Sequence, residues 1–146
     1  VALAEALKPE FKEYARKTVE NAQALAKALT ARGFNLVSGG TDNHLMLIDL
    51  NNKGIPGKPY AVALEKAGII LNYNTVPGET RKASDPSGIR LGTPSVTSRG
   101  FGIAEMEKIA EWMDKAVACC EDDAKLAEIA KEVEALCSKF SVPGIE

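Results

Sequence analysis

The segment from residue 9 to residue 31 narrows the possible folds most, because it predicts one long amphipathic helix. Pro9 suits the first helical turn, and Gly33 is placed to end the helix. Leu3 and Leu7 lie upstream without an obvious partner in the chain, so we interpret the first residues as part of a larger contact. Apolar and small side chains recur along the helix at steps of three and four residues and form one stripe: Phe11, Ala15, Thr18, Ala22, Leu25 and Leu29.

The next segment predicts a β-hairpin. Residues 34–37 and 44–50 are short apolar runs, and residues 38–43 between them are rich in Gly, Asp and Asn, which favour turns. The spacing favours an antiparallel pair of strands. Because the second run is apolar at consecutive positions, we expect its strand to be buried on both faces.

The rest of the chain predicts three more helices and two more strands. Residues 59–67 form a short helix, residues 69–71 a strand, and the short segment around Arg90, bounded by glycines, a second strand. Two helices follow, one after Gly102 and one capped by Asp122 or its neighbour Asp123, and we expect them to form an αα-hairpin against one face of the sheet. Their apolar stripes are Ile103, Met106, Ile109, Ala110, Met113 and Val117, then Leu126, Ile129, Val133, Leu136 and Phe140.

Together these elements predict an α/β (α+β) two-layer sandwich, in which a small, mostly antiparallel sheet of three or four strands carries helices on one face. A length of 146 residues, with 45% apolar and 26% charged residues, suits a single compact domain over residues 1–146. The net charge is −2 and no basic stripe is present, which argues against nucleic-acid binding. No apolar run approaches the roughly 20 residues that a membrane span needs.

The three cysteines, Cys119, Cys120 and Cys137, lack the spacing of metal ligands. Their number is odd and two are adjacent, so we interpret them as small core residues of a protein in a reducing, cytoplasmic compartment. The first residue is Val1 and no signal peptide is visible, so we expect the true N-terminus of the protein to lie elsewhere.

The best pointer to a function is the polar segment 72–87 together with the strand that follows it. A loop of this length in a small domain is usually functional. The strand holds Ile89 and Leu91 on one face and Arg90 on the other, with glycines at both ends. A guanidinium in this position binds a carboxylate in a bidentate way. The sequence leaves two interpretations open: a ligand carboxylate, or a partly buried structural ion pair.

Two features nearby carry weaker signals. Gly39 and Gly40 resemble a phosphate-binding loop, but the full glycine-rich pattern is missing and no helix follows, so we favour a plain turn. We interpret His44, the only histidine, as a hydrogen-bonded structural residue rather than a catalyst.

Three motifs, in order, resemble serine hydroxymethyltransferase, a pyridoxal-phosphate enzyme of one-carbon metabolism and glycine biosynthesis. They are Ser-Gly-Gly-Thr-Asp-Asn-His-Leu at residues 38–45, Leu-Asn-Tyr-Asn-Thr-Val-Pro at residues 71–77, and Ser-Gly-Ile-Arg-Leu-Gly-Thr-Pro at residues 87–94. The resemblance extends from residue 1 to about residue 140, and this segment resembles only the C-terminal (small) domain of the family. It implies the small-domain fold of fold-type I pyridoxal-phosphate enzymes, with residues 1–31 as an inter-domain linking helix region.

The resemblance assigns roles to individual residues. Arg90 matches the arginine that grips the carboxylate of serine or glycine, and Asn74 matches a contact to the pterin of tetrahydrofolate, the co-substrate. Lys82, Ala83 and Ser84 fall on the neighbouring folate-contacting segment. There the family usually has a Ser-Pro-Phe-like triplet, so the position carries over to this chain and the residue types do not.

The resemblance also implies what this chain lacks. In the family, the lysine that attaches the cofactor follows a threonine-rich run and a histidine, and none of the thirteen lysines here has that context. The other cofactor-binding residues belong to a large domain that is missing. We therefore expect the chain alone to be inactive, and its parent to be a homodimer or homotetramer.

Two other functions remain open at this stage. One is a stand-alone module that binds small carboxylates or amino acids without catalysis, through Arg90 and the 72–87 segment. The other is a structural domain in which Arg90 forms a buried ion pair.

Overall fold

The computed structural model describes residues 1–144 and contains one four-stranded antiparallel sheet. The strand order is β1-β2-β4-β3, so the last two strands are exchanged relative to the chain order. The predicted β1–β2 hairpin and the predicted small antiparallel sheet are both confirmed. The strands are β1 (Asn35–Leu36), β2 (Leu45–Asp49), β3 (Asn72–Asn74) and β4 (Gly88–Gly92).

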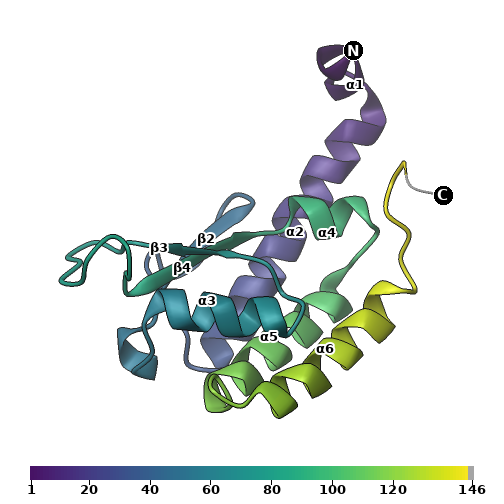
Figure 1. The fold of residues 1–146 in the computed structure, drawn as a ribbon. Coiled ribbons are helices and arrows are strands. Elements are labelled where there is room, and N and C mark those ends of the chain that lie inside the picture. The colour runs from purple at the N-terminus through teal and green to yellow at the C-terminus, as the bar shows by residue number, and fades with distance from the viewer. Residues whose placement is uncertain (145–146) are drawn as a thin grey trace.

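Helices α2 (Pro9–Ala31) and α3 (Gly57–Lys66) pack on one face of this sheet (Figure 1), which confirms the predicted small antiparallel sheet with helices on one face. Helices α5 and α6 pack mainly against α2 and α3, so the predicted αα-hairpin does not lie directly on the sheet. Met46, Ile48 and Ile89 point from the sheet into a core that they share with helix residues. None of the helices within residues 1–144 has the length and apolar character to cross a membrane. The helices are α1 (Ala2–Ala6), α2 (Pro9–Ala31), α3 (Gly57–Lys66), α4 (Pro94–Ser98), α5 (Ile103–Ala118) and α6 (Asp123–Cys137), with a 3-10 turn, η1, at Asn51–Lys53.

Helix α2 has the predicted bounds, but only its C-terminal half is packed. Leu25 and Leu29 lie in the core, whereas Phe11 is 45% exposed. The first turns of α2 and all of α1 extend beyond the rest of the molecule (Figure 1). Leu3 and Leu7 on this extension are 83% and 87% exposed, so they have no partner in the described chain, as expected.

Two strand predictions were wrong. Strand β2 is buried on one face only, because Met46 and Ile48 face the helices while Leu45 and Leu47 face away from them. The third strand starts at Asn72 rather than at residue 69. The reason is that Ile69 still donates to Leu64 O (2.8 Å) at the end of α3, and the ladder with β4 begins only afterwards.

The C-terminal helices bury the central part of their predicted stripes and have the predicted cap, but Ile103 is 61% exposed and Phe140 lies beyond the end of α6. Met106, Met113 and Leu126 are fully buried, and the Asp122 carboxylate accepts a hydrogen bond from Lys125 N (3.1 Å) at the start of α6. The three cysteines are free thiols; Cys119 is buried and the other two are partly buried. Among residues 1–144, no group of His, Cys, Asp and Glu side chains has the arrangement of a metal site.

Candidate functional site

Arg90 lies at the centre of the sheet face that no helix covers. In the ladders it pairs with Leu47 of β2 and with Asn72 of β3, and directly paired residues share a face. Its neighbour Ile89 is fully buried on the opposite face. Arg90 is exposed, and its guanidinium makes no ion pair or hydrogen bond within residues 1–144. The interpretation of Arg90 as a buried structural ion pair is therefore wrong.

The strand that carries Arg90 is held closely by its neighbours. A Cβ atom on Gly88 would lie 2.4 Å from Val76 Cγ1 and 2.8 Å from Ile48 O. A Cβ atom on Gly92 would lie 2.7 Å from His44 O. Both positions thus require glycine because the adjacent chain segments leave no space for a side chain. This close packing fixes the backbone on either side of the guanidinium.

The end of β4 is anchored to α2 by buried hydrogen bonds. Thr93 Oγ1 donates to Thr18 O (2.7 Å), and Thr97 Oγ1 donates to Thr93 O (2.7 Å). Asn21 of α2 donates through Nδ2 to Thr97 Oγ1 and to Phe101 O, both at 2.9 Å. All these polar side chains are buried and paired, so they hold the segment after Arg90 in one conformation.

Asn74 shares the open face with Arg90. It pairs with Gly88, two residues from Arg90 along β4, which places the two Cα positions about 7 Å apart along the strand direction. The side chain is partly buried, and its Nδ2 donates to Thr75 O (2.8 Å). The structure therefore brings the two predicted residues Arg90 and Asn74 together on one surface.

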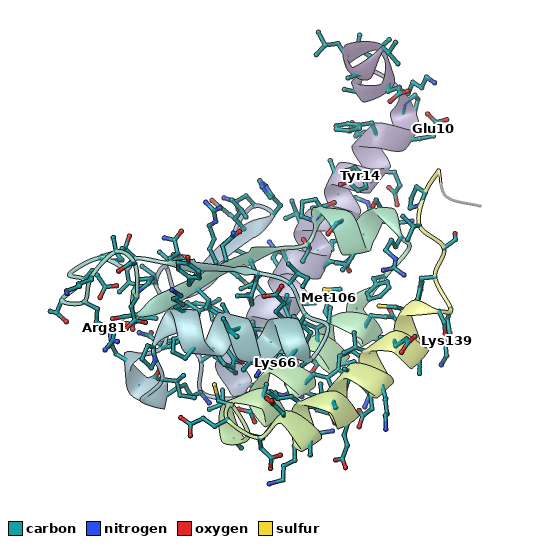
Figure 2. All side chains as sticks on the ribbon, viewed as in Figure 1. Glu10, Tyr14, Lys66, Arg81, Met106 and Lys139 are labelled. Carbon is teal, nitrogen blue, oxygen red and sulfur yellow. The ribbon has the colours of Figure 1, made fainter. Side chains whose placement is uncertain are left out.

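Lys82, Ala83 and Ser84 lie elsewhere, at the exposed tip of the loop that joins β3 to β4. The neighbouring Arg81, labelled in Figure 2, forms an ion pair with Asp85 and donates through Nε to Asp85 O (3.0 Å). In the described chain the triplet makes no side-chain hydrogen bond to Arg90 or Asn74. The structure does not bring the triplet against the other two predicted residues.

Glu79 is a residue that the sequence analysis missed. Its Oε2 accepts from Ser87 N (2.8 Å), and its Oε1 accepts from Ser87 Oγ (2.7 Å) and from Arg81 N (2.9 Å). These hydrogen bonds, first those from Ser87 and then that from Arg81, lower the pKa of the Glu79 carboxyl to about 2. The carboxylate thus closes the loop at its base, directly before the Arg90 strand.

His44 and the double glycine play smaller parts. The His44 side chain is exposed and its ring makes no hydrogen bond in the part of the chain that the structure describes, so its interpretation as a hydrogen-bonded residue was wrong. Residues 38–43 form the predicted turn, in which Thr41 Oγ1 donates to Leu45 O (2.6 Å) and Asn43 Oδ1 accepts from Leu45 N (2.8 Å).

Comparison with known proteins identifies the family. The family model described as "Serine hydroxymethyltransferase" matches residues 1–113. The chain belongs to this family. Curated relatives agree: the serine hydroxymethyltransferase of Sorangium cellulosum is 58% identical over 145 residues, 99% of this chain and 34% of that protein.

Two further serine hydroxymethyltransferases match over the whole chain. That of Desulfotalea psychrophila is 60% identical over 146 residues, 34% of its length, and that of Acidothermus cellulolyticus is 59% identical over 152 residues, 36% of its length. The chain thus spans about a third of the length of the curated relatives that it matches. These matches do not favour the alternative of a stand-alone carboxylate-binding module.

Proposed function

We propose that this chain is the C-terminal (small) domain of a serine hydroxymethyltransferase, which moves the hydroxymethyl group of serine to tetrahydrofolate and leaves glycine. The chain forms one wall of the active site. The observation that supports this role most is the guanidinium of Arg90, which has no partner within residues 1–144 and lies on an uncovered sheet face in a strand bounded by Gly88 and Gly92.

Arg90 binds the carboxylate of serine or glycine. Its planar fork donates two parallel hydrogen bonds to a carboxylate, which fixes the orientation of the amino acid as well as its position. A rigid strand suits this task better than a loop, because small displacements of the binding group lower catalysis strongly. Leu47 and Asn72, on either side of Arg90 in the sheet, shape the surface against which the amino acid lies.

Asn74 contacts the pterin of tetrahydrofolate, and the segment Lys82-Ala83-Ser84 contacts another part of this co-substrate. An asparagine amide offers donors and an acceptor on one plane, which matches the edge of a pterin ring. Asn74 shares its face with Arg90, so the amino acid and the folate would meet on the same surface. The exposed position of residues 82–84 leaves them free for contact with a ligand.

The parent enzyme depends on pyridoxal phosphate, which acts as an electron sink for the bound amino acid. The surface around Arg90 does not fit the task of holding this cofactor. Its paired positions carry Leu47 and Asn72, and no lysine stands at the ladder positions of β2, β3 or β4. The contribution of this chain is therefore to bind and orient the amino acid and the folate. Without the large domain it does not catalyse the reaction.

Residues 1–31 link this domain to the large domain, and the exposed side chains of Leu3, Leu7 and Phe11 pack against it. The parent is a homodimer or a homotetramer of the cytoplasm. Three free thiols are typical of a reducing compartment, and the mixed surface charge offers no basic stripe for nucleic acid.

A chimeric enzyme tests the proposed function. The matching 34% of the Desulfotalea psychrophila serine hydroxymethyltransferase is replaced by these 146 residues, and folate-dependent conversion of serine to glycine is measured. We expect turnover close to that of the relative, because the residues that this chain supplies to the site are present. A folded chimera without folate-dependent turnover would contradict the proposal.

A further inference from the structure

The base of the loop between β3 and β4 is closed by the Glu79 carboxylate, and the Arg81–Asp85 ion pair lies within the loop that it closes. Glu79 and Ser87 are eight residues apart, and the two oxygens of Glu79 take both hydrogen-bond donors of Ser87 together with Arg81 N. Residues 80–86 therefore form a closed loop with Glu79 at its base and Lys82, Ala83 and Ser84 at its tip.

The Ser87 side of this closure is fixed to the body of the domain. Ser87 is 2% exposed, and its carbonyl accepts from Leu50 N (3.1 Å). The carbonyl of Pro86 accepts from Gly57 N (2.7 Å) at the start of α3. Ser87 is thus the fixed end of the closure, and Glu79 joins the loop to it directly before the strand that carries Arg90.

We infer that Glu79 is a positioning residue that orders residues 80–86 for tetrahydrofolate without acting on the amino-acid site. This inference rests on the proposed function for its ligand. Glu79 acts through the loop tip, whereas Arg90 is fixed independently by the tight contacts of Gly88 and Gly92. Loss of the Glu79 carboxylate therefore affects the folate and leaves the binding of serine unchanged.

The hydrogen bonds that Glu79 accepts determine which variants test the inference. All three groups that face the Glu79 carboxylate are donors, so an acceptor is needed on both oxygens. Glu79→Gln keeps the size of the side chain but turns one oxygen into a donor, which opposes a donor of Ser87 or Arg81. Glu79→Asp keeps both acceptors on a shorter side chain and restores part of the closure. Glu65→Gln, on the exposed surface of α3, is the matched control.

The first measurement is limited trypsin digestion of the 146-residue chain. Cleavage after Arg81 and Lys82 reports the order of the loop, and cleavage after Lys139, beyond α6, serves as the internal reference. We expect Glu79→Gln to raise the rate of loop cleavage, relative to cleavage after Lys139, about tenfold. The cleavage rate of Glu79→Asp should lie between those of Glu79→Gln and the parent chain, and the cleavage rate of Glu65→Gln should equal that of the parent chain. Equal rates in all variants would overturn the inference.

The second measurement compares the KM for tetrahydrofolate with the KM for serine in the chimeric enzyme. We expect Glu79→Gln to raise the folate KM about tenfold and to leave the serine KM within about twofold. An equal rise of both constants would reduce Glu79 to a general structural role and overturn the inference. If the unsubstituted chimera shows no folate-dependent turnover, the proposed function fails together with the folate part of this inference. The trypsin digestion then still decides whether Glu79 orders the loop.

Discussion

Arg90 of β4 lies directly opposite Leu47 of β2, on the sheet face that carries no helix. The pairing places a charged side chain next to an aliphatic one on an open surface, while the next residue on each strand, Ile89 and Ile48, is fully buried on the other face. The same ladder thus supplies both the core of the domain and its candidate binding surface. Changes that disturb the ladder should therefore affect stability and binding together.

Gly88→Ala should destabilise the domain. The added Cβ would lie 2.4 Å from Val76 Cγ1, 2.8 Å from Ile48 O and 2.9 Å from Asn74 O, and two of these atoms belong to backbone that cannot move aside easily. We expect the free energy of unfolding to fall by about 1–3 kcal/mol, the range for overpacking. Urea denaturation measures this change. Gly40→Ala is the control, because its Cβ would meet no atom within 4 Å, and equal stabilities of the two variants would contradict the packing argument.

Asn21→Ala should destabilise the connection between α2 and the end of β4. Asn21 is 3% exposed and donates to Thr97 Oγ1 and Phe101 O, so the variant leaves two buried acceptors without this donor. We expect a loss of about 1–3 kcal/mol in the free energy of unfolding. Gln23→Ala changes an exposed amide of the same helix and should have little effect. Similar losses in both variants would show that the buried network is not the cause.

The contribution of Glu79 to stability should depend on pH in a defined direction. Hydrogen bonds lower the pKa of the folded Glu79 carboxyl from its ordinary value of 4.5 to about 2. The folded state therefore favours the ionised form, so the stabilisation is fully present above pH 4.5 and is lost as the pH falls toward 2. The difference in the free energy of unfolding between the parent chain and Glu79→Gln should shrink over this interval.

Urea denaturation at a series of pH values measures this difference. Glu111→Gln offers a comparison, because hydrogen bonds from the side chains of Lys108 and Lys115 lower the pKa of that carboxyl to about 2 as well. Salt should screen the exposed Glu111 pairs more than the backbone hydrogen bonds of Glu79. A Glu79 effect that grows as the pH falls would contradict the assigned cause.

The sequence predicted α2, α3, α5, α6 and the hairpin because their signals are local, whereas it missed the five-residue helices α1 and α4. The stripe ending at Leu29, the glycine after α2 and the Asp122 cap each act within a few residues of the chain, so periodicity and capping rules found them. Strand β3 was placed too early for the opposite reason. Asn72 is a polar residue that joins the sheet through its pairing with Arg90, and no local sequence pattern predicts this pairing.

The candidate site was predictable in part for the same reason. The alternation of side chains along the strand predicted that Arg90 lies on the face opposite to Ile89 and Leu91. It did not predict whether another element covers the face that carries Arg90. Glu79 was missed because two of its three hydrogen-bond donors, the backbone and hydroxyl groups of Ser87, belong to a residue eight positions away. A single glutamate in a polar loop has no periodic signal, and only the folded loop brings it to Ser87.

The mass of the natural polypeptide tests the proposed domain organisation. If this chain is one domain of a serine hydroxymethyltransferase, the cellular product that contains residues 87–101 should be about three times longer than 146 residues, like its relatives. It should also carry a lysine after a threonine-rich run in the additional part. Intact-mass spectrometry of the purified product measures this, and a product of about 146 residues would contradict the organisation.

The most direct test of the central claim is the affinity of the chimeric enzyme for serine and glycine with Arg90 and with Arg90→Lys. Lysine keeps the charge but loses the bidentate fork, so we expect binding of both amino acids to weaken by about 1.5–3 kcal/mol, roughly 10- to 150-fold. Tetrahydrofolate binding and the urea midpoint should remain close to the parent values, because Arg90 has no partner within the described residues. Unchanged affinity for serine and glycine in a folded Arg90→Lys enzyme would contradict the assignment of Arg90 as the group that binds the amino-acid carboxylate.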